Sequence, residues 1–328
     1  MKMPLFLVRN SRRLAQGALT LICVCLIGSL GSDGIVATTA DGRVMRFSSV
    51  GQLNDYYERI GYTVEALQAG GLRVPRLYLT GIPGDWALGM PIDSKKSVFF
   101  RTLLPLVLSV NEEVLANRKR LEALDQRIAR GGNLGDADRR WLIALADEYR
   151  LAERVARIGV NGAQDGGWAD LIAELLPRVD GVPVSLALGQ AAYESAYATS
   201  RFASEGNALF GQWAWGRGML PQEQREALND HRVAAFPSPR DSAVSYLRNL
   251  NTHVAYDEFR SIRARGRRQD EALGGYRLAE TLARYSEGGA DYVAILRRII
   301  ADNDLDRFDG LSLADGQSAV SLSVALNR

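Results

Sequence analysis

Glu194 is the residue of this sequence best suited to acid–base chemistry. It lies in the segment 182–198, which has a proline at position 183, suited to the first turn of a helix, and contains no other charged residue. A carboxyl group among alanine, leucine, glycine and tyrosine is costly to ionise, so burial should raise its pKa. A carboxylic acid still protonated near neutral pH can protonate the leaving oxygen of a glycoside. The plainer alternative is a glutamate on the solvent-facing side of an amphipathic helix.

Groups of the kind that bind sugars follow Glu194 closely. The segment 204–215 contains two amides, two glycines and three aromatic residues. Aromatic faces cover the apolar faces of sugar rings, and amides hydrogen-bond hydroxyl and acetamido groups. Phe210 and Trp213 could instead be ordinary core residues, with the backbone of Phe210 shaping the site. The residues of this segment that could bind substrate are Asn207, Phe210, Gly211, Trp213 and Trp215.

The composition excludes several other kinds of chemistry. The 328 residues are 47% hydrophobic and 24% charged, with 40 basic and 38 acidic side chains, so the chain is neither disordered nor held to nucleic acid by bulk charge. Both cysteines, Cys23 and Cys25, lie in an early apolar run, and the only histidines are His231 and His253. The rest of the chain therefore offers no cysteine nucleophile and no three-histidine zinc site. We expect no metal and no organic cofactor.

The first 40 residues have the features of an export signal. Four basic residues precede the apolar run 17–31, and small and polar residues follow it, as is typical of a secretory signal. The run is shorter than the ~20 apolar residues of a membrane span, although residues 14–31 could form an uncleaved inner-membrane anchor, or a buried helix. An exported chain of this size without later cysteines indicates a bacterial envelope. We expect the periplasm or the periplasmic face of the inner membrane.

The elements that position these residues are expected to be helices. Apolar residues recur with helical spacing over 48–70, and long helices are expected at 97–130, with a kink at Pro105, and at 136–158. The two long helices would form a hairpin. Its charged outer face is most simply a solvated surface, and a partner-binding role is the alternative.

Glycine-rich and small polar stretches suggest where the chain divides. Residues 161–167 are suited to a linker, and the residues from 310 onward to a flexible tail. We therefore expect a signal peptide or anchor (1–40), an N-terminal helical region (41–162), a catalytic domain (163–309) and a tail (310–328).

Several motifs in the catalytic region resemble those of one enzyme family. Gln190–Tyr197 and Asn207–Gly211 are similar to the Gln-Ala-x-x-Glu-Ser and Asn-x-Leu-Phe-Gly motifs of the glucosaminidase domains of glycoside hydrolase family 73, which are bacterial cell-wall enzymes. The resemblance covers residues 165–306 and, more weakly, the helix expected over 102–121. Further strings resemble the Bax-like branch in particular, namely Phe210–Trp213, Arg232–Phe236, Tyr246–Tyr256 and the closing tyrosine motif Tyr285–Tyr292.

The resemblance implies a fold, a reaction and a set of site residues. The fold would be mainly α, with a lysozyme-like helical catalytic domain, a small β-lobe near residues 213–236, and the helical hairpin region before it. The reaction would be hydrolysis of the β-1,4 bond after N-acetylglucosamine in peptidoglycan, with glycan strands rather than nucleic acid as the partner. Glu194 would be the catalytic acid and Tyr292 the tyrosine that contacts substrate. The other motif residues expected to bind substrate are Gln190, Asn207, Gly211 and Tyr285.

The group that completes the reaction is left open by the sequence. A two-carboxylate mechanism needs a second acid, about 5–5.5 Å away for retention or ~6.5–9.5 Å for inversion. Glu223, Glu226 and Asp230 fall in the lobe where some family members place one, although a solvated helix face explains them as well. Alternatively, the acetamido group of the substrate acts as nucleophile. Tyr285 or Tyr292 would then orient it.

Two other functions also fit the sequence. A lytic transglycosylase would use one acid in the same fold without water as nucleophile, and a non-catalytic wall-binding or scaffold protein would use the hairpin as its functional surface. His231 and His253 could act as bases, although side-chain to backbone hydrogen bonds explain His253 more simply. A cluster of arginines could bind wall-peptide carboxylates or form a charged helix surface: Arg260, Arg263, Arg265, Arg267 and Arg268.

Overall fold

The computed structural model describes residues 34–39, 41–70, 72–160, 165–215, 218–220, 231–271 and 273–315. Three sets of residues that the sequence singled out lie outside the described residues. They are the apolar run of the expected export signal, the candidate second acids Glu223, Glu226 and Asp230, and the expected tail from residue 316 onward. The side chains of Trp215 and His231 lie outside them too. No helix in the described part combines the length and apolarity that a membrane span requires.

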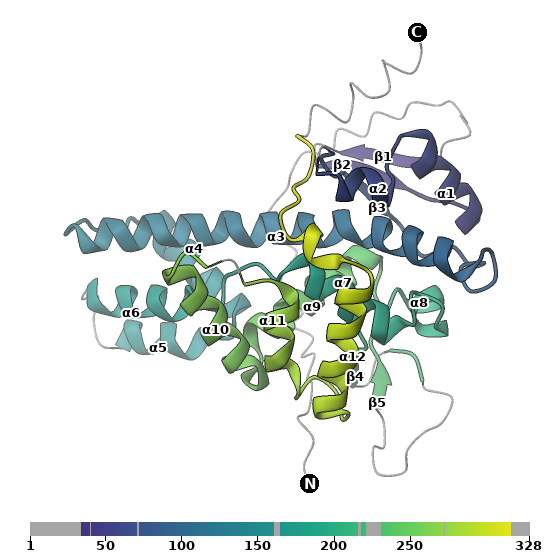
Figure 1. The fold of residues 1–328 in the computed structure, drawn as a ribbon. Helices are drawn as coiled ribbons and strands as arrows, with labels where there is room; N and C mark the ends of the chain where they lie inside the picture. The colour runs from purple at the N-terminus through teal and green to yellow at the C-terminus, as the bar shows by residue number, and fades with distance from the viewer. Residues whose placement is uncertain are drawn as a thin grey trace.

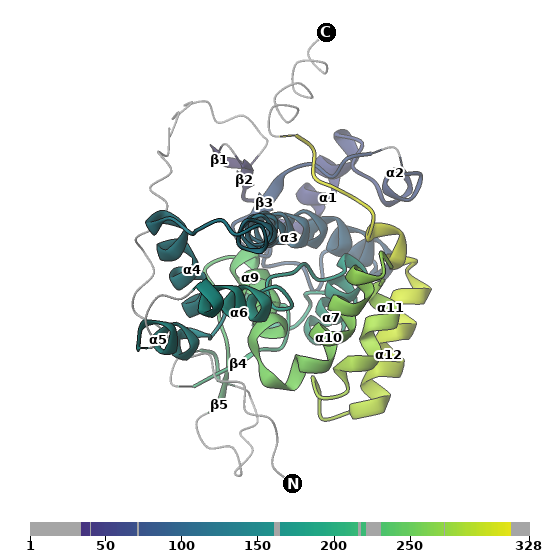
Figure 2. The same ribbon diagram turned by 90° about the vertical axis from the view of Figure 1, so that its left-hand side faces the viewer.

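The 38-residue helix α3 (Ile92–Ala129) runs through the molecule. Figure 1 shows a small sheet and two short helices above it, and most of the other helices below. In Figure 2, which looks along α3, helices α4 to α6 lie to one side and α10 to α12 to the other. The remaining α-helices of the described residues are α1 (Val50–Arg59), α2 (Val64–Gln68), α4 (Asp136–Glu148), α5 (Ala152–Val160), α6 (Asp165–Leu175), α7 (Val184–Ser195), α8 (Arg201–Gly206), α9 (Pro239–Thr252), α10 (Asp257–Arg268), α11 (Gly275–Leu278) and α12 (Gly289–Asp302).

Two small sheets complete the described fold. The first joins β1 (Ile35–Thr39), β2 (Gly42–Met45) and β3 (Leu77–Leu79), with β1 antiparallel and β3 parallel to β2. Strand β1 falls within the last residues of the segment expected to be a signal or anchor. The second sheet pairs β4 (Trp213–Trp215) with β5 (His231–Val233) in antiparallel register. This hairpin is the small β-lobe that the sequence predicted.

Helix α3 continues through Pro105, where the sequence predicted a kink. Proline lacks an N–H, so the carbonyl group of Arg101, four residues earlier, has no intrahelical donor. The hydroxyl group of the buried Tyr62 donates to that carbonyl oxygen at 2.9 Å. A side chain from the N-terminal region therefore supplies the hydrogen bond that the proline removes.

The second arm of the expected hairpin is divided into two helices. It ends as α4 at Glu148 and resumes as α5 at Ala152, so the single helix expected over 136–158 is wrong. Arg150 adopts a left-handed conformation at φ 62°, and the amide of Leu151 donates to the carbonyl of Ala146 at 2.7 Å. This closes α4 with the tight turn typical of helix C-termini.

The apolar residues form two cores that share α3. One core contains the first half of α3 together with residues from the N-terminal sheet, α1, α7, α9 and α12. The other contains the second half of α3 with α4, α5 and α6. The N-terminal region thus packs in the same core as the helix that carries Glu194. At the other end of the chain, Leu313 and Ala314, at the start of the expected tail, are buried, and the amide of Ala314 donates to the carbonyl of Val74 at 2.8 Å.

The expected fold class is confirmed. The described residues form a mainly α structure with a lysozyme-like helical domain and a small β-lobe, and the long α3 precedes that domain. The expected linker at 161–167 overlaps the start of α6, which begins at Asp165.

Part of the arginine cluster on α10 is structural. Arg260 is buried and donates to the carbonyl oxygens of Leu250 and His253 at 2.8 and 2.9 Å. Arg263 and Arg267 converge on the fully buried Asp180, which Arg118 of α3 also approaches, at 3.4 Å. A buried charge is stable only when it is paired in this way. The prediction that the whole cluster could meet wall-peptide carboxylates is therefore wrong for Arg260 and Arg263.

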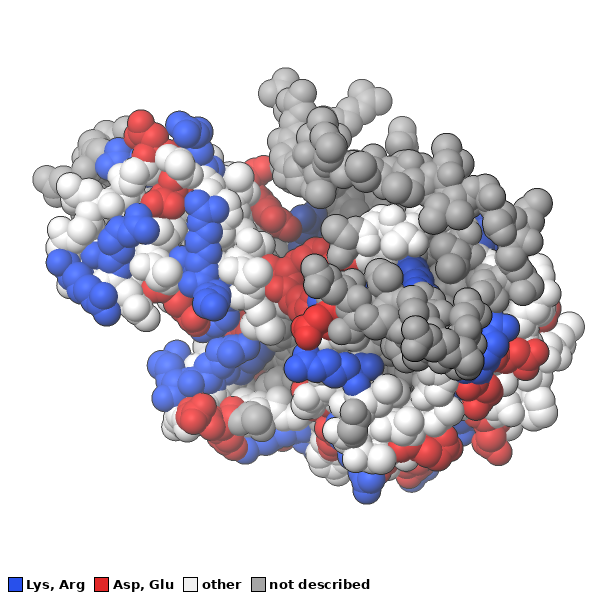
Figure 3. Space-filling view, turned by 90° about the horizontal axis from the view of Figure 1, so that it is seen from above, with Lys and Arg blue, Asp and Glu red and all other residues white. Residues whose placement is uncertain are grey.

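The outer surface around the C-terminal end of α3 carries both basic and acidic side chains. In the view of Figure 3, the left-hand lobe shows basic and acidic side chains interspersed rather than a field of one sign. Charged side chains of α3 and α4 are paired, as Arg120 and Arg127 are with Asp138 at 3.1 and 2.8 Å. Exposed pairs of this kind contribute little stability. Partner binding by this surface stays a prediction.

Candidate active site

Glu194 occupies the last turn of α7, and Ser195 ends that helix. The Ser195 hydroxyl donates to the carbonyl of Ala191 at 2.6 Å and accepts the amide of Ala198 at 2.8 Å. Residues 196, 197 and 198 then adopt left-handed conformations, with φ of 49°, 57° and 62°. Such conformations are costly for residues other than glycine. The carboxyl group is thus carried on a rigid helix immediately before a tightly constrained turn.

Two hydrogen bonds orient the tyrosine that faces Glu194. The hydroxyl of Tyr246 donates to Oε1 of Gln190 at 2.6 Å, and Nε2 of Gln190 donates to the hydroxyl oxygen of Tyr292 at 2.8 Å. Since that oxygen already accepts from Gln190, the Tyr292 proton is directed to Glu194, with which Tyr292 is hydrogen-bonded. Gln190 lies one helical turn before Glu194 and is fully buried. It therefore lies behind the acid and fixes the direction of the Tyr292 proton.

The environment of Glu194 favours the protonated acid. Burial raises the pKa of Glu194 to about 7, and the hydrogen bond from Tyr292, which favours the carboxylate, offsets part of this rise. Glu194 as a whole is half-buried. Among the described residues, no second carboxyl group contributes to this shift. The elevated pKa is the one expected from the uncharged segment around Glu194.

Gly211 lies directly against the carboxyl group. Its φ is +60°, and a Cβ atom there would lie 2.2 Å from Oε2 of Glu194. A side chain at this position would push the Glu194 carboxyl group aside, and the backbone conformation is one that glycine adopts without strain. Glycine therefore lets the loop after α8 approach the acid without displacing it.

Phe210 and Tyr285 hold this loop from behind. The ring of Phe210 is buried and stacks on Tyr246 with 4.1 Å between centroids. Tyr285 donates from its hydroxyl to the carbonyl oxygen of Phe210 at 2.8 Å, and its ring lies parallel to that of Tyr292 at 5.9 Å. Phe210 is thus a core residue whose backbone shapes the site, and Tyr285 belongs to the same buried layer of rings.

Asn207 joins three segments of the chain. It ends α8 in a left-handed conformation, and its Nδ2 donates to the carbonyl of Phe236 at 3.0 Å. Its Oδ1 accepts the amide of Ile82 at 3.4 Å. The side chain therefore links the β-lobe and the N-terminal region to the loop that leads to Gly211.

The tryptophans of β4 lie in the β-lobe. The backbone of Trp213 pairs with Val233, and its side chain is partly exposed. Trp215 pairs with His231. The side chain of His253 caps the short helical turn Val254–Tyr256, with Nδ1 accepting the amide of Ala255 at 3.1 Å. This contact agrees with the local role predicted for His253.

Two tyrosines beside the acid were missed as individual site residues. Tyr246 anchors Gln190, and its pKa is raised by burial. Tyr193 is 38% exposed, and its ring meets that of Tyr292 edge-on at 5.1 Å. Helical spacing in the sequence predicts which tyrosines are buried, but it carries no signal for the partner of a buried hydroxyl group.

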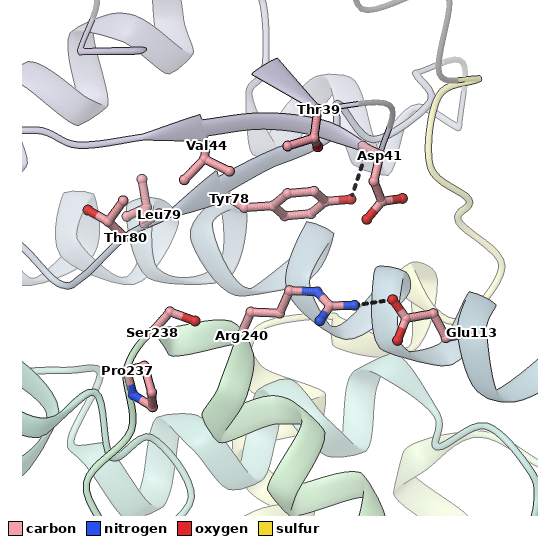
Figure 4. Close-up of a pocket in the computed structure, with 10 residues that line it drawn as sticks. All are labelled: Thr39, Asp41, Val44, Tyr78, Leu79, Thr80, Glu113, Pro237, Ser238 and Arg240. Atoms are coloured by element: carbon pink, nitrogen blue, oxygen red, sulfur yellow. Dashed lines mark hydrogen bonds and ion pairs between the residues drawn. The ribbon is translucent and has the colours of Figure 1, made fainter. Parts of the chain in front are cut away.

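A cavity of about 420 Å³ lies elsewhere, between the N-terminal sheet and the start of α9. Figure 4 shows Tyr78 donating to the carbonyl of Asp41, at 3.2 Å, and Arg240 paired with Glu113. Glu194 is not among its lining residues, so this cavity is separate from the candidate active site. In the described part of the chain, no group of three histidine, cysteine or acidic side chains is placed to hold a metal ion.

A lysozyme-like helical domain that presents a protonated acid beside a β-lobe has the architecture of a glycoside hydrolase domain. Residues 147–305 match the glucosaminidase family, described as mannosyl-glycoprotein endo-beta-N-acetylglucosaminidase, so this part of the chain is similar to a glucosaminidase domain. The chain is also similar to Protein bax of Escherichia coli (strain K12), with 28% identity over 244 residues, or 74% of this chain and 78% of that protein. No solved structure matches the chain. The resemblance predicted from the motifs is confirmed.

Proposed function

We propose that this protein is a peptidoglycan hydrolase that cleaves the β-1,4 bond after N-acetylglucosamine, with Glu194 as the general acid. The observation that carries the proposal is the Glu194 carboxyl group, with a pKa of about 7, hydrogen-bonded to Tyr292 and lying against the backbone of Gly211. An acid with a pKa near the working pH is protonated often enough to act and is strong enough to give up its proton.

Each described group has a part in the first step. Glu194 donates its proton to the glycosidic oxygen as the bond to the anomeric carbon breaks, and the leaving sugar departs as an alcohol. Glu194 becomes a carboxylate, which the Tyr292 hydroxyl stabilises by donating its proton in a hydrogen bond. Gln190 keeps the Tyr292 oxygen in place throughout. The anomeric carbon bonds either to a nucleophile that water later displaces, in which case the Glu194 carboxylate accepts the proton of that water, or directly to a water whose proton a second carboxylate accepts.

The contacts of two tyrosines bear on whether a second carboxylate or the acetamido group of the substrate assists Glu194. Tyr285 donates to the carbonyl of Phe210, and Tyr292 is engaged by Gln190 and Glu194. Both tyrosine hydroxyls are therefore already committed and have no spare proton with which to orient the acetamido group of a substrate. This favours a second carboxylate, and Glu223, Glu226 and Asp230 are the candidates on the segment between β4 and β5.

The proposed substrate is peptidoglycan rather than a glycoprotein. The family description names a β-N-acetylglucosaminidase of mannosyl-glycoproteins, and the chemistry shared with the proposal is cleavage after N-acetylglucosamine. The basic and apolar start of the chain supports export to the periplasm or to the periplasmic face of the inner membrane, where peptidoglycan is the available polymer of N-acetylglucosamine.

Analysis of new sugar ends tests this proposal against its rivals. Purified peptidoglycan is incubated with the mature protein, and the ends are identified after reduction with borohydride. The proposal expects new reducing N-acetylglucosamine ends. Anhydro-muramyl ends would instead identify a lytic transglycosylase, and an absence of new ends with retained binding to the polymer would identify a wall-binding protein.

A further inference from the structure

The left-handed turn after Glu194 is supported from outside the glucosaminidase domain. The indole N–H of Trp86 donates to the carbonyl oxygen of Tyr197, the central residue of the turn, at 2.7 Å. Trp86 lies 61 positions before residue 147, where the family match begins (147 − 86 = 61). It is fully buried and belongs to the same core as α7.

The loop that carries Trp86 is itself fixed at two points. The amide of Val50, at the start of α1, donates to Oδ1 of Asp85 at 2.8 Å. The ammonium group of the buried Lys95 donates to the carbonyl of Ala87 at 2.6 Å. The indole N–H is therefore presented to the turn by a rigid support.

The side chain of Tyr197 is held as firmly as its carbonyl group. Phe99 and Phe100 of α3 meet its ring edge-on, with centroids at 5.6 and 6.0 Å. Its hydroxyl group is hydrogen-bonded to Asn303, at the end of α12. The turn is thus held by contacts with α3, with the end of α12 and with the loop that carries Trp86. These contacts stabilise residues 196–198 in the left-handed conformation, which is otherwise costly for residues other than glycine.

We propose that Trp86 is a positioning residue for Glu194: its hydrogen bond to Tyr197 holds the left-handed turn that fixes where the acid is presented. The inference rests on the proposed function for its catalytic consequence. It implies that residues before the glucosaminidase domain are part of the catalytic unit. Without the Trp86 bond the turn relaxes, and Glu194 shifts relative to Gly211 and Tyr292.

The test compares two tryptophan-to-phenylalanine variants. Trp86→Phe keeps an aromatic ring and removes the N–H donor, whereas Trp168→Phe makes the same change in the other core, among α4 to α6. We expect Trp86→Phe to lower kcat by roughly tenfold to a hundredfold with little change in KM, because a small displacement of a catalytic group has effects of this size. Trp168→Phe should retain the wild-type kcat. Both are assayed well below their unfolding temperatures.

A third variant separates positioning from general stability. Ala196 is exposed and has φ 49°, so Ala196→Gly relieves backbone strain without loss of packing. In the Trp86→Phe background this change should restore kcat several-fold, since the turn then needs less support. If Trp86→Phe does not fold, replacing Trp86 with benzothienylalanine, which keeps the bicyclic ring and lacks the N–H, tests the same bond.

Hydrogen exchange gives a readout that does not depend on activity. The amides of Tyr197, Ala198 and Ser200 are bonded within the turn, and we expect them to exchange about tenfold faster in Trp86→Phe but not in Trp168→Phe. Wild-type exchange, faster exchange with unchanged kcat, or no recovery in the double variant would each overturn the inference. If the wild-type protein cleaves no peptidoglycan, the proposed function fails. The exchange rates would still test whether the hydrogen bond from Trp86 stabilises the turn.

Discussion

The backbone of Gly211 and the carboxyl group of Glu194 are in direct contact: a Cβ atom at residue 211 would lie 2.2 Å from Oε2 of Glu194. The acid is therefore bounded on one side by main chain, which cannot change rotamer or move away. On another side it meets Tyr292, whose proton direction is set by Gln190. These two contacts restrict the position of the carboxyl group.

Replacing Gly211 with alanine should displace Glu194 and lower activity. We expect Gly211→Ala to reduce kcat on peptidoglycan by about a hundredfold, because the added carbon and the carboxyl oxygen cannot occupy the same space. Gly131→Ala is the matched control: Gly131 also has positive φ, +79°, but nothing lies within 4 Å of its Cβ position. It should lose about 1 kcal/mol of stability and keep its activity. Equal activity in both variants would contradict the contact.

Removing the Tyr292 hydroxyl should raise the pKa of Glu194. That hydroxyl favours the carboxylate, so in Tyr292→Phe the pKa should move above about 7. The alkaline limb of the pH–kcat profile, along which the general acid loses its proton, should shift to higher pH, with kcat lower by roughly tenfold. The exposed Tyr276→Phe is the control. A limb that stays in place or moves to lower pH would show that Tyr292 does not bond the acid.

Ionisation of Glu194 should lower the stability of the folded protein at alkaline pH. The pKa of Glu194 is about 7 in the folded protein, against 4.5 for a free glutamate, so between these values the folded state binds more protons than the unfolded state. The free energy of unfolding therefore falls as pH rises through this window. At about pH 8, Glu194→Gln should be more stable than wild type by on the order of 2 kcal/mol, and at about pH 4 the difference should vanish. Urea unfolding at both pH values measures this, and a destabilised variant at alkaline pH would contradict it.

The sequence predicted the helix of Glu194 and its raised pKa because both follow from local composition. A helical segment with no charge except one carboxyl group is expected to be buried on most of its surface, and burial of the carboxyl group raises its pKa. The sequence could not predict the hydrogen-bond partners of the Gln190 side chain, because Tyr246 and Tyr292 lie 56 and 102 positions away. The division between α4 and α5 was missed for a different reason: Arg150, unlike glycine, gives no signal of a left-handed turn.

Contacts between residues far apart in the sequence explain other features that local reasoning missed. Pro105 frees the carbonyl group of Arg101, and only the placement of Tyr62 shows that this carbonyl group has a donor. Arg260 and Arg263 look like surface charges in a basic stretch. Their burial becomes evident only when the carbonyl groups of Leu250 and His253, and the carboxylate of Asp180, are seen to face them.

The most direct test of the central claim is the rate at which Glu194→Gln releases reducing N-acetylglucosamine ends from peptidoglycan. Glutamine keeps the size of the side chain and has no acidic proton to donate. Glu153→Gln, at an exposed position on α5, is the matched control. We predict that Glu194→Gln loses activity by a factor of about 10²–10⁴ while its circular dichroism spectrum is unchanged, and that Glu153→Gln retains the wild-type rate. Wild-type activity in a folded Glu194→Gln protein would contradict the account.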